Sequence, residues 1–196
     1  MRKKSHVLLA VYLVNNLNIE ELAAHRKAFY LGSILPDCRP SFVTTPHCYT
    51  RTIGLVREKI GKIIEESSIE GELTSVFCRK LGEISHYLAD YFTFPHNENF
   101  EGTVKEHCIY EGNLKTALEN YIENGQVKEE KRERGRFRSL DDLMEFIDGV
   151  YKEYCRVKRC VAEDCVYIVS IVSMVIEGII NLITQFGNHR LILQGV

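Results

Sequence analysis

The sequence predicts an all-α protein, and three observations support that prediction. Only four prolines occur among 196 residues, so long stretches contain no helix breaker. Apolar residues recur at helical spacing along most of the chain. No stretch shows a convincing alternation of apolar and polar residues, which a half-buried strand would require. Since no internal repeat is visible, we expect a single multi-helix domain over residues 1–196.

The expected helices follow from apolar periodicity and from their boundary residues. They cover residues 5–17, 19–31, 51–66, 72–92, 103–123, 139–157 and 161–186. Ser5 is a candidate N-cap for the first helix, and Gly32 is expected to end the second. Ser139, followed three residues later by Asp142, resembles the start of a capping box.

The segments between these helices carry turn and charge signals. Residues 33–50 contain three of the four prolines, and residues 93–102 contain Pro95 and Gly102, so both are expected to be loops. The run KEEKRERGRFR, residues 128–138, mixes acidic and basic side chains in nearly equal number. This balance favours a solvated segment over a nucleic-acid-binding patch.

Two apolar stretches raise the question of a membrane. Residues 165–186 approach the roughly 20 residues of a transmembrane helix. Glu177, Asn181 and Gln185 interrupt them at four-residue spacing, which favours a buried amphipathic helix and no transmembrane segment. The start, MRKKSHVLLAVYLVNN, has a brief apolar run and no small-residue cleavage site, so a signal peptide is not expected.

Composition narrows the class of protein. Hydrophobic residues make up 45% and charged residues 27%, as in an ordinary soluble protein. A net charge of −2 supplies no basic field for nucleic acid, so a nucleic-acid partner is not favoured. Seven cysteines, without CxxC pairs, favour reduced thiols and a cytoplasmic protein.

Histidines and carboxylates recur at spacings suited to a metal. His86 and Asp90 are four residues apart on one helix face, and His107 and Glu111 repeat that spacing on the next helix. His96 lies between the two pairs, directly after Pro95. Alone, His86 and Asp90 would fit a structural hydrogen-bonded pair. Together with the second pair and His96, they favour zinc, which imidazole and carboxylate bind well.

Three further residues complete the candidate set. Asp37 and His47 lie in the proline-rich segment, and His6 lies on the first helix. Eight ligands can serve two or three ions if one carboxylate bridges, and metals about 3.5–4 Å apart are usual in displacement at phosphorus. His25 and His189 lie outside the pattern and are not expected to bind metal.

At these residues the sequence resembles the zinc-dependent phospholipase C family. The family's order of ligands is found in HYLADYFTFPH followed by HCIYE. The family's aspartate segment resembles FYLGSILPD, and its N-terminal histidine segment resembles SHVLLA. His47 is supplied by TPH. The matches span residues 6–111. Single-strand-specific zinc nucleases share the all-helical trinuclear arrangement, but they end the pattern with Asp and place the last pair farther away. Glu111 therefore favours the phospholipase side.

The resemblance implies a role for each residue. One zinc would take Asp37, His47, His86 and Asp90. A second would take His96, His107 and Glu111. A third would share Asp90 and use His6. Asp37 would also be the general base, and a zinc-bound hydroxide would attack phosphorus in line.

The chain departs from the family at its start. Secreted members use the amino group and carbonyl of an N-terminal tryptophan as ligands to the third zinc, whereas this chain begins with Met1-Arg2-Lys3-Lys4. The resemblance thus implies two zincs and leaves the third undetermined. The implied partner is a phosphate-ester substrate, with a phospholipid headgroup as the family's example.

Two other functions stay open at this stage. A single-strand nuclease or nucleotidase-like zinc phosphoesterase would present aromatic stacking surfaces beside the metals. A catalytically inactive metal-binding helical protein would have sites closed entirely by protein ligands. No residue in the sequence selects choline, ethanolamine, sugar phosphate or nucleotide.

Overall fold

The computed structural model describes residues 1–39, 46–70, 74–124, 137–156 and 160–193, with the side chains of 68–70 and 186–193 outside the description. It is all-α, as predicted, and the described residues contain no strand. The elements are α1 (Lys3–Asn16), α2 (Glu20–Ala24), α3 (Arg26–Ile34), η1 (Pro36–Cys38), α4 (Tyr49–Glu70), α5 (Ser75–Tyr91), η3 (Phe94–His96), α6 (Val104–Glu123), α7 (Leu140–Cys155) and α8 (Val161–Leu193).

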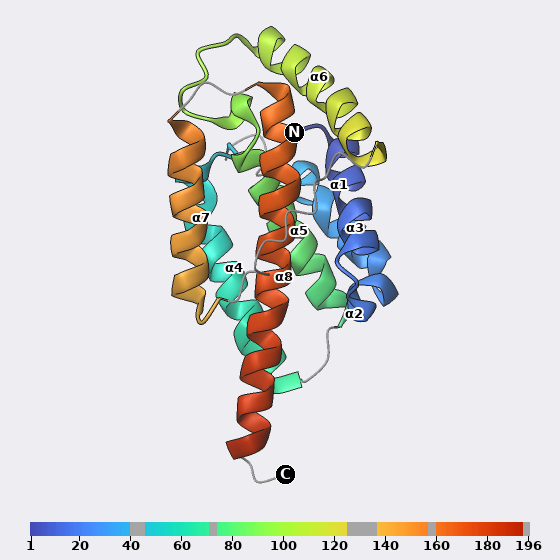
Figure 1. Cartoon of the computed structure of the whole chain (residues 1–196), viewed down its shortest axis with the longest axis vertical. Coiled ribbons are helices and arrows are strands. Elements are labelled where there is room, and N and C mark those ends of the chain that lie inside the picture. The colour runs from blue at the N-terminus through green and yellow to red at the C-terminus, as the bar shows by residue number, and fades with distance from the viewer. Residues whose placement is uncertain (40–45, 71–73, 125–136, 157–159, 194–196) are drawn as a thin grey trace.

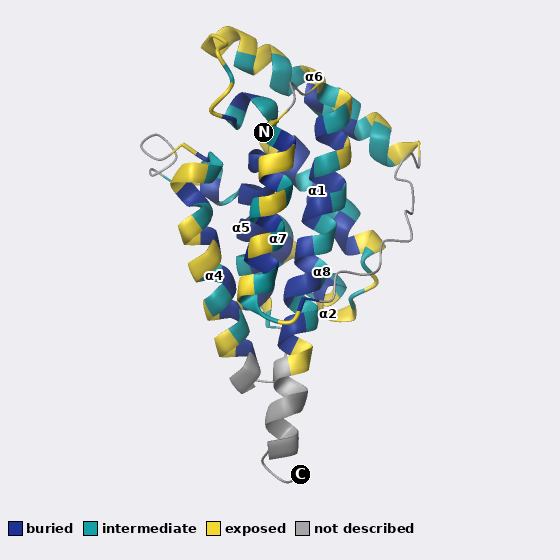
Figure 2. Cartoon of the chain, turned by 60° about the vertical axis from the view of Figure 1, so that its left-hand side comes forward, coloured by how far each residue is buried: buried dark blue, intermediate teal, exposed yellow. Residues whose placement is uncertain are grey.

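Helix α5 lies at the centre of the bundle. It contacts α1, α3, α4 and α8, and its residues from Leu81 to Tyr91 are all buried. Helix α6 lies at the end of the bundle where the N-terminus is found (Figure 1). The burial pattern gives α5 an inner position and leaves one side of α4 and α6 exposed (Figure 2).

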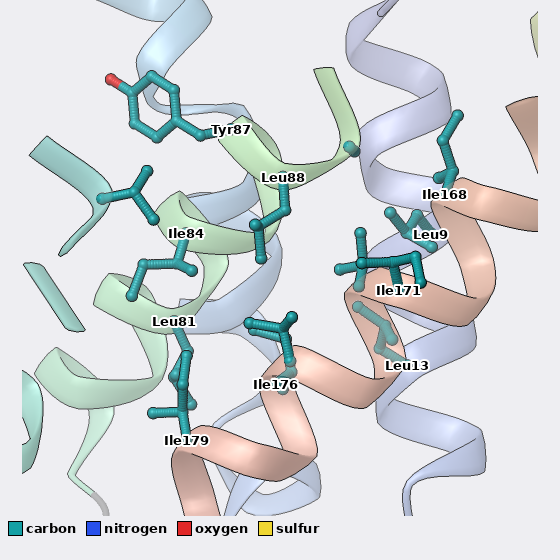
Figure 3. Packing of buried hydrophobic residues seen from close by; sticks show 14 of the residues in the cluster. Leu9, Leu13, Leu81, Ile84, Tyr87, Leu88, Ile168, Ile171, Ile176 and Ile179 are labelled. Atoms are coloured by element: carbon teal, nitrogen blue, oxygen red, sulfur yellow. The ribbon is translucent and has the colours of Figure 1, made fainter. Parts of the chain in front are cut away.

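The core forms where α1, α5 and α8 meet. Leu81 and Leu88 of α5 face the α8 residues Ile176 and Ile179, whereas Tyr87 points away from them (Figure 3). Leu9 and Leu13 of α1 pack beside Ile168 and Ile171 of α8 in the same view. Burial of these apolar side chains is the main force holding the helices together.

Helix α8 combines length with an apolar surface. Its residues Val161–Gln185 are long and apolar enough to cross a membrane, and 61% of the apolar window is buried inside the protein. The helix contacts α4, α5, α6 and α7, as the predicted core helix would. Glu177 and Asn181 are half-buried and Gln185 is exposed, so the polar stripe lies on the less buried side.

The first two predicted helices differ from the structure. Helix α1 begins at Lys3 with Arg2 as its N-cap, and Ser5 is a buried residue within the helix. The predicted helix 19–31 is divided at His25, and its second part continues to Ile34. Gly32 lies inside α3 and does not end the helix. A glycine is needed there because α3 packs too closely against α5 to leave room for a Cβ.

The starts of α6 and α7 agree with the predictions, whereas α4 is longer at both ends than the predicted helix 51–66 and α8 continues beyond the predicted end at residue 186. The Ser139 hydroxyl accepts a hydrogen bond from the Asp142 amide at 3.1 Å and caps α7. Thr103 and Glu106 form a full capping box at the start of α6. Most of the predicted solvated run 128–138 lies outside the described residues, as does the side chain of His189.

Candidate metal centre

The structure brings the predicted metal ligands together from six segments of the chain. Helix α5, at the centre, supplies His86 and Asp90, and the other segments surround its C-terminal half. Their origins are His6 in α1, Asp37 in η1, His47 just before α4, His96 in η3, and His107 and Glu111 in α6.

One group has the dimensions of a tetrahedral zinc site. His47 Nδ1 lies 2.9 Å from His86 Nε2. Asp90 Oδ2 lies 3.2 Å from His47 Nδ1 and 3.3 Å from His86 Nε2. Asp37 Oδ1 lies 3.7 Å from His47 Nδ1 and 3.5 Å from His86 Nε2. Ligand atoms around a tetrahedral zinc are about 3.3 Å apart, since the bonds are about 2.0–2.1 Å long, so His47, His86 and Asp90 fit one ion. Asp37 lies slightly farther from both histidines and also forms a group with His6 and His86.

The second group lies where η3 meets α6. Glu111 Oε1 lies 3.2 Å from His96 Nε2 and also 3.2 Å from His107 Nε2. His107 is 33% exposed, whereas His86 is 0% exposed, so the second group is the one nearer to solvent. Its three atoms can hold a zinc ion that keeps a position for water or substrate, which a catalytic zinc site requires.

Asp90 connects the first group to His6 and to the Met1 amine. Its Oδ2 faces His47 and His86, while its Oδ1 lies 3.3 Å from His6 Nε2 and 2.6 Å from the amino nitrogen of Met1. A carboxylate whose two oxygens face different sets of donors can bridge two metals. This arrangement is the one that the predicted bridging role of Asp90 requires.

The ring of His6 is buried in the centre. It is 1% exposed and stacks on the His86 ring with centroids 3.8 Å apart. Neither of its nitrogens makes a hydrogen bond to any described residue. Unsatisfied buried nitrogens are costly, and a metal ion between His6 and Asp90 would satisfy one of them.

The amino group of Met1 occupies a place that the sequence did not reveal. Its nitrogen lies 2.6 Å from Asp90 Oδ1, 2.9 Å from Glu111 Oε1 and 2.8 Å from His96 Nε2. Arg2 fixes this position by donating from Nη2 to the carbonyl oxygen of Cys108, at 2.9 Å. An amine nitrogen therefore lies between the two groups, although the family's tryptophan is missing.

Buried charges set the protonation states of the site. Burial, together with the neighbouring His86, lowers the pKa of His6 to about 3. Burial and then the Met1 amine lower the pKa of His96. Burial acts to raise the pKa of Asp90, but the Met1 amine and His96 hold it well below its usual range. Neutral imidazoles beside an ionised carboxylate are the forms that bind zinc.

The pKa values of Glu111 and Asp37 are shifted in opposite directions. Burial acts to raise the pKa of Glu111, but hydrogen bonds with His107 and His96 hold it below its usual range. Burial raises the pKa of Asp37, although His86 opposes this. A raised pKa makes Asp37 a better proton acceptor than Glu111.

The orientation of His86 depends on a close contact between α3 and α5. Its Nδ1 lies 2.8 Å from the carbonyl oxygen of Ser33, which can only accept, so Nδ1 carries the hydrogen and Nε2 is left as a ligand. A Cβ on Gly82 would lie 2.2 Å from Phe29 O, and one on Gly32 would lie 2.1 Å from Arg79 O. These two glycines allow the helices to approach.

A buried ion-pair cluster supports the segment of Asp37. Glu83, which is 3% exposed, accepts from Arg39 at 2.9 and 3.1 Å and from Lys59 at 2.8 Å. Arg39 follows η1, so the bidentate pair ties the Asp37 segment to α5 one turn before His86.

The fold and these groups define an all-helical protein with candidate metal-binding groups of histidines and carboxylates between its helices. The profile of the zinc-dependent phospholipase C family matches residues 5–161, so the chain belongs to that family, as its motifs predicted. The match contains all eight candidate ligands and at the family level supports a zinc phosphoesterase. Comparisons with curated proteins and with solved structures found no match.

Proposed function

We propose that this protein is a zinc-dependent phosphoric ester hydrolase of phospholipase C type. The observation that carries the proposal is two neighbouring ligand groups, one buried and one nearer to solvent, with the Met1 nitrogen between Asp90 of the first and Glu111 of the second. The proposed ligands are those predicted from the sequence: His6, Asp37, His47, His86, Asp90, His96, His107 and Glu111. One zinc ion is proposed for Asp37, His47, His86 and Asp90, and a second for His96, His107 and Glu111. A third zinc ion is proposed for His6 and Asp90.

Zinc bound in these groups would supply a Lewis acid that acidifies an attacking water molecule and neutralises charge on the phosphoryl group. The side chain of Asp37 would accept the proton. Its Oδ1 faces His47 and His86, which leaves Oδ2 as the accepting atom, and its side chain is 9% exposed. Its raised pKa supports this role as general base.

The Met1 amine supports the third site. With Met1 as the first residue, its nitrogen would be a neutral donor after losing a proton, next to Asp90 Oδ1, which itself lies 3.3 Å from His6 Nε2. Burial alone would lower the pKa of this amine, but Asp90 and Glu111 raise it. Zinc at the third site would therefore compete with a proton, and its occupancy is expected to fall at low pH.

A phosphate ester is the proposed substrate, with a phospholipid headgroup as the first candidate because of the family. All seven cysteines are free thiols, which supports a reducing compartment, and we propose the cytoplasm. We also propose that residues 1–196 form one helical domain, since ligands from α1 to α6 and the core of α8 belong to the same bundle.

The test is an assay panel on zinc-loaded protein. It contains phosphatidylcholine and phosphatidylethanolamine vesicles, a nucleotide, single-stranded DNA and an aryl phosphodiester. Hydrolysis of a phospholipid or the aryl diester is the expected result. Asp37→Asn, assayed at saturating zinc because Asp37 is also a proposed ligand, should abolish it. Loss of a general base typically costs about 10²–10⁴-fold in rate.

The other outcomes identify the alternatives. Cleavage of single-stranded DNA alone would place the protein with the zinc nucleases. Zinc-loaded protein that is inactive on every substrate would overturn the proposed function and leave a metal-binding helical protein.

A further inference from the structure

A buried carboxylate in α8 lies outside the candidate metal centre but contacts the segments that form it. Asp164 is 0% exposed and accepts three hydrogen bonds. The Tyr154 hydroxyl donates to Oδ1 at 2.7 Å. The Tyr110 hydroxyl and the Phe94 amide donate to Oδ2 at 2.8 and 2.9 Å. Buried carboxylates are rare unless such donors satisfy them, so these bonds hold the geometry firmly.

The two donors on Oδ2 come from the segments of one ligand group. Phe94 begins η3, two residues before His96. Tyr110 lies in α6, directly before Glu111 and three residues after His107. One oxygen atom thus joins the short segment of His96 to the helix that carries the other two ligands.

The segment of His96 needs such a support. Element η3 has only three residues, and the His96 amide donates to Thr93 O at 2.8 Å within the same turn. The rings of Phe94 and Tyr110 contact each other with centroids 5.9 Å apart. Ligands must be held within about 0.5 Å of the productive geometry, and supporting hydrogen bonds supply that precision.

The third hydrogen bond to Asp164 comes from a helix without proposed ligands, so it serves as an internal control for the two bonds to Oδ2. Tyr154 lies in α7, and α7 contributes none of the proposed ligands. Asp164 itself lies beyond residue 161, where the family match ends. The support therefore comes from α8, a part of this chain that the family profile does not include.

We propose that Asp164 is a positioning residue for the zinc site formed by His96, His107 and Glu111. Its Oδ2 fixes η3 relative to α6 and so sets the distances between the ligand atoms. This inference rests on the proposed function, since it assumes that the group binds zinc.

The test compares two conservative variants, Tyr110→Phe and Tyr154→Phe. Each removes one hydroxyl from Asp164 and keeps the aromatic ring, so similar losses of thermal stability are expected. Zinc affinity is measured by competition with a chromophoric chelator, and Co²⁺ absorption spectra report the geometry of the site. Tyr110→Phe should weaken one site at least about 10-fold and alter the spectrum, because supporting partners of metal ligands typically contribute about 10–100-fold. Tyr154→Phe should leave both readouts close to wild type. Equal effects of the two variants, or a smaller effect of Tyr110→Phe, would overturn the inference.

His107→Ala separates this inference from the proposed function. If His107→Ala binds as much zinc as wild type, the ligand assignment itself fails. If it loses one zinc, then Tyr110→Phe in the His107→Ala background should have no further effect on the remaining sites. A further weakening there would show that Tyr110 acts on the whole protein and would overturn the positioning role.

Discussion

His86 is held by the main chain of Ser33, whose carbonyl oxygen lies 2.8 Å from Nδ1. The bond joins residues 53 positions apart in the sequence. It exists because α3 and α5 approach closely at Gly32 and Gly82. Helix packing therefore determines which nitrogen of His86 faces the metal centre.

Gly82→Ala should separate the two helices and disturb His86. Its Cβ would lie 2.2 Å from Phe29 O, a backbone atom that cannot rotate away. We expect a loss of about 3 kcal/mol in the free energy of unfolding, as for overpacked cores, together with weaker zinc binding. Urea denaturation and zinc titration measure the two effects.

Gly149→Ala is the matched control for that substitution. Gly149 is an exposed helical glycine with no atom within 4 Å of an added Cβ. Alanine there should stabilise the protein by about 0.5–1 kcal/mol. If Gly82→Ala were as stable as Gly149→Ala, the close contact of α3 with α5 would not exist as described.

Asp90→Ala should affect more of the centre than any single histidine variant. Since the two oxygens of Asp90 face different donors, its removal is expected to release more than one zinc per chain, whereas His107→Ala releases one. Without metal, the variant leaves the Met1 ammonium buried with one partner fewer. We expect about 3–5 kcal/mol of destabilisation, as for a broken buried ion pair.

Elemental analysis and urea denaturation test this prediction. Asp141→Ala is the control, because Asp141 is 81% exposed and its ion pair with Arg57 lies on the surface. Equal zinc loss in Asp90→Ala and His107→Ala would remove the bridging role from Asp90.

Arg2→Ala should loosen the Met1 amine. The Arg2 side chain donates to Cys108 O and lies over Gly112 of α6, which holds the start of the chain against the ligand helix. A third zinc that uses this amine should bind about 10-fold more weakly in the variant. A Gly-Ser extension before Met1 should lower its occupancy further, since the nitrogen becomes an amide.

Lys3→Ala is the control for Arg2→Ala, since both residues are exposed and adjacent. Zinc competition at pH 7.5 measures the affinities. Unchanged affinity of every site in both Arg2→Ala and the extended chain would exclude the Met1 amine as a donor.

The sequence predicted the helical class and the two local pairs of candidate ligands for a physical reason. His86 with Asp90, and His107 with Glu111, are local pairs whose common face follows from helical periodicity alone. The assignment of zinc to these ligands remains a prediction, although their distances fit it. The prediction of one domain and of a cytoplasmic location likewise remains a prediction.

Contacts between distant segments could not be predicted in the same way. The Ser33 carbonyl, the support from Asp164 and the Met1 amine all depend on which helices meet and at what depth. Periodicity indicates that a face is buried, but it does not identify the partner of that face. Gly32 was misassigned as a helix end for this reason, because its role is in packing against α5.

The metal-free protein should lose stability as the pH falls below about 6.5, and His6 should be one cause. Burial and the nearby His86 lower its pKa from 6.5 to about 3. Between these values the unfolded chain binds a proton on His6 that the native protein does not. Stability from this residue is therefore fully present above pH 6.5 and is lost as the pH falls toward 3, by up to about 1.4 kcal/mol per pH unit.

Urea denaturation of chelator-treated wild type and His6→Gln, between pH 4 and 7.5, isolates the effect. The stability difference between the two proteins should shrink as the pH falls from 6.5 to 4, because glutamine does not titrate. A constant difference across that range would mean that His6 is accessible to protons in the native protein, and its burial beside His86 and Asp90 would then be wrong.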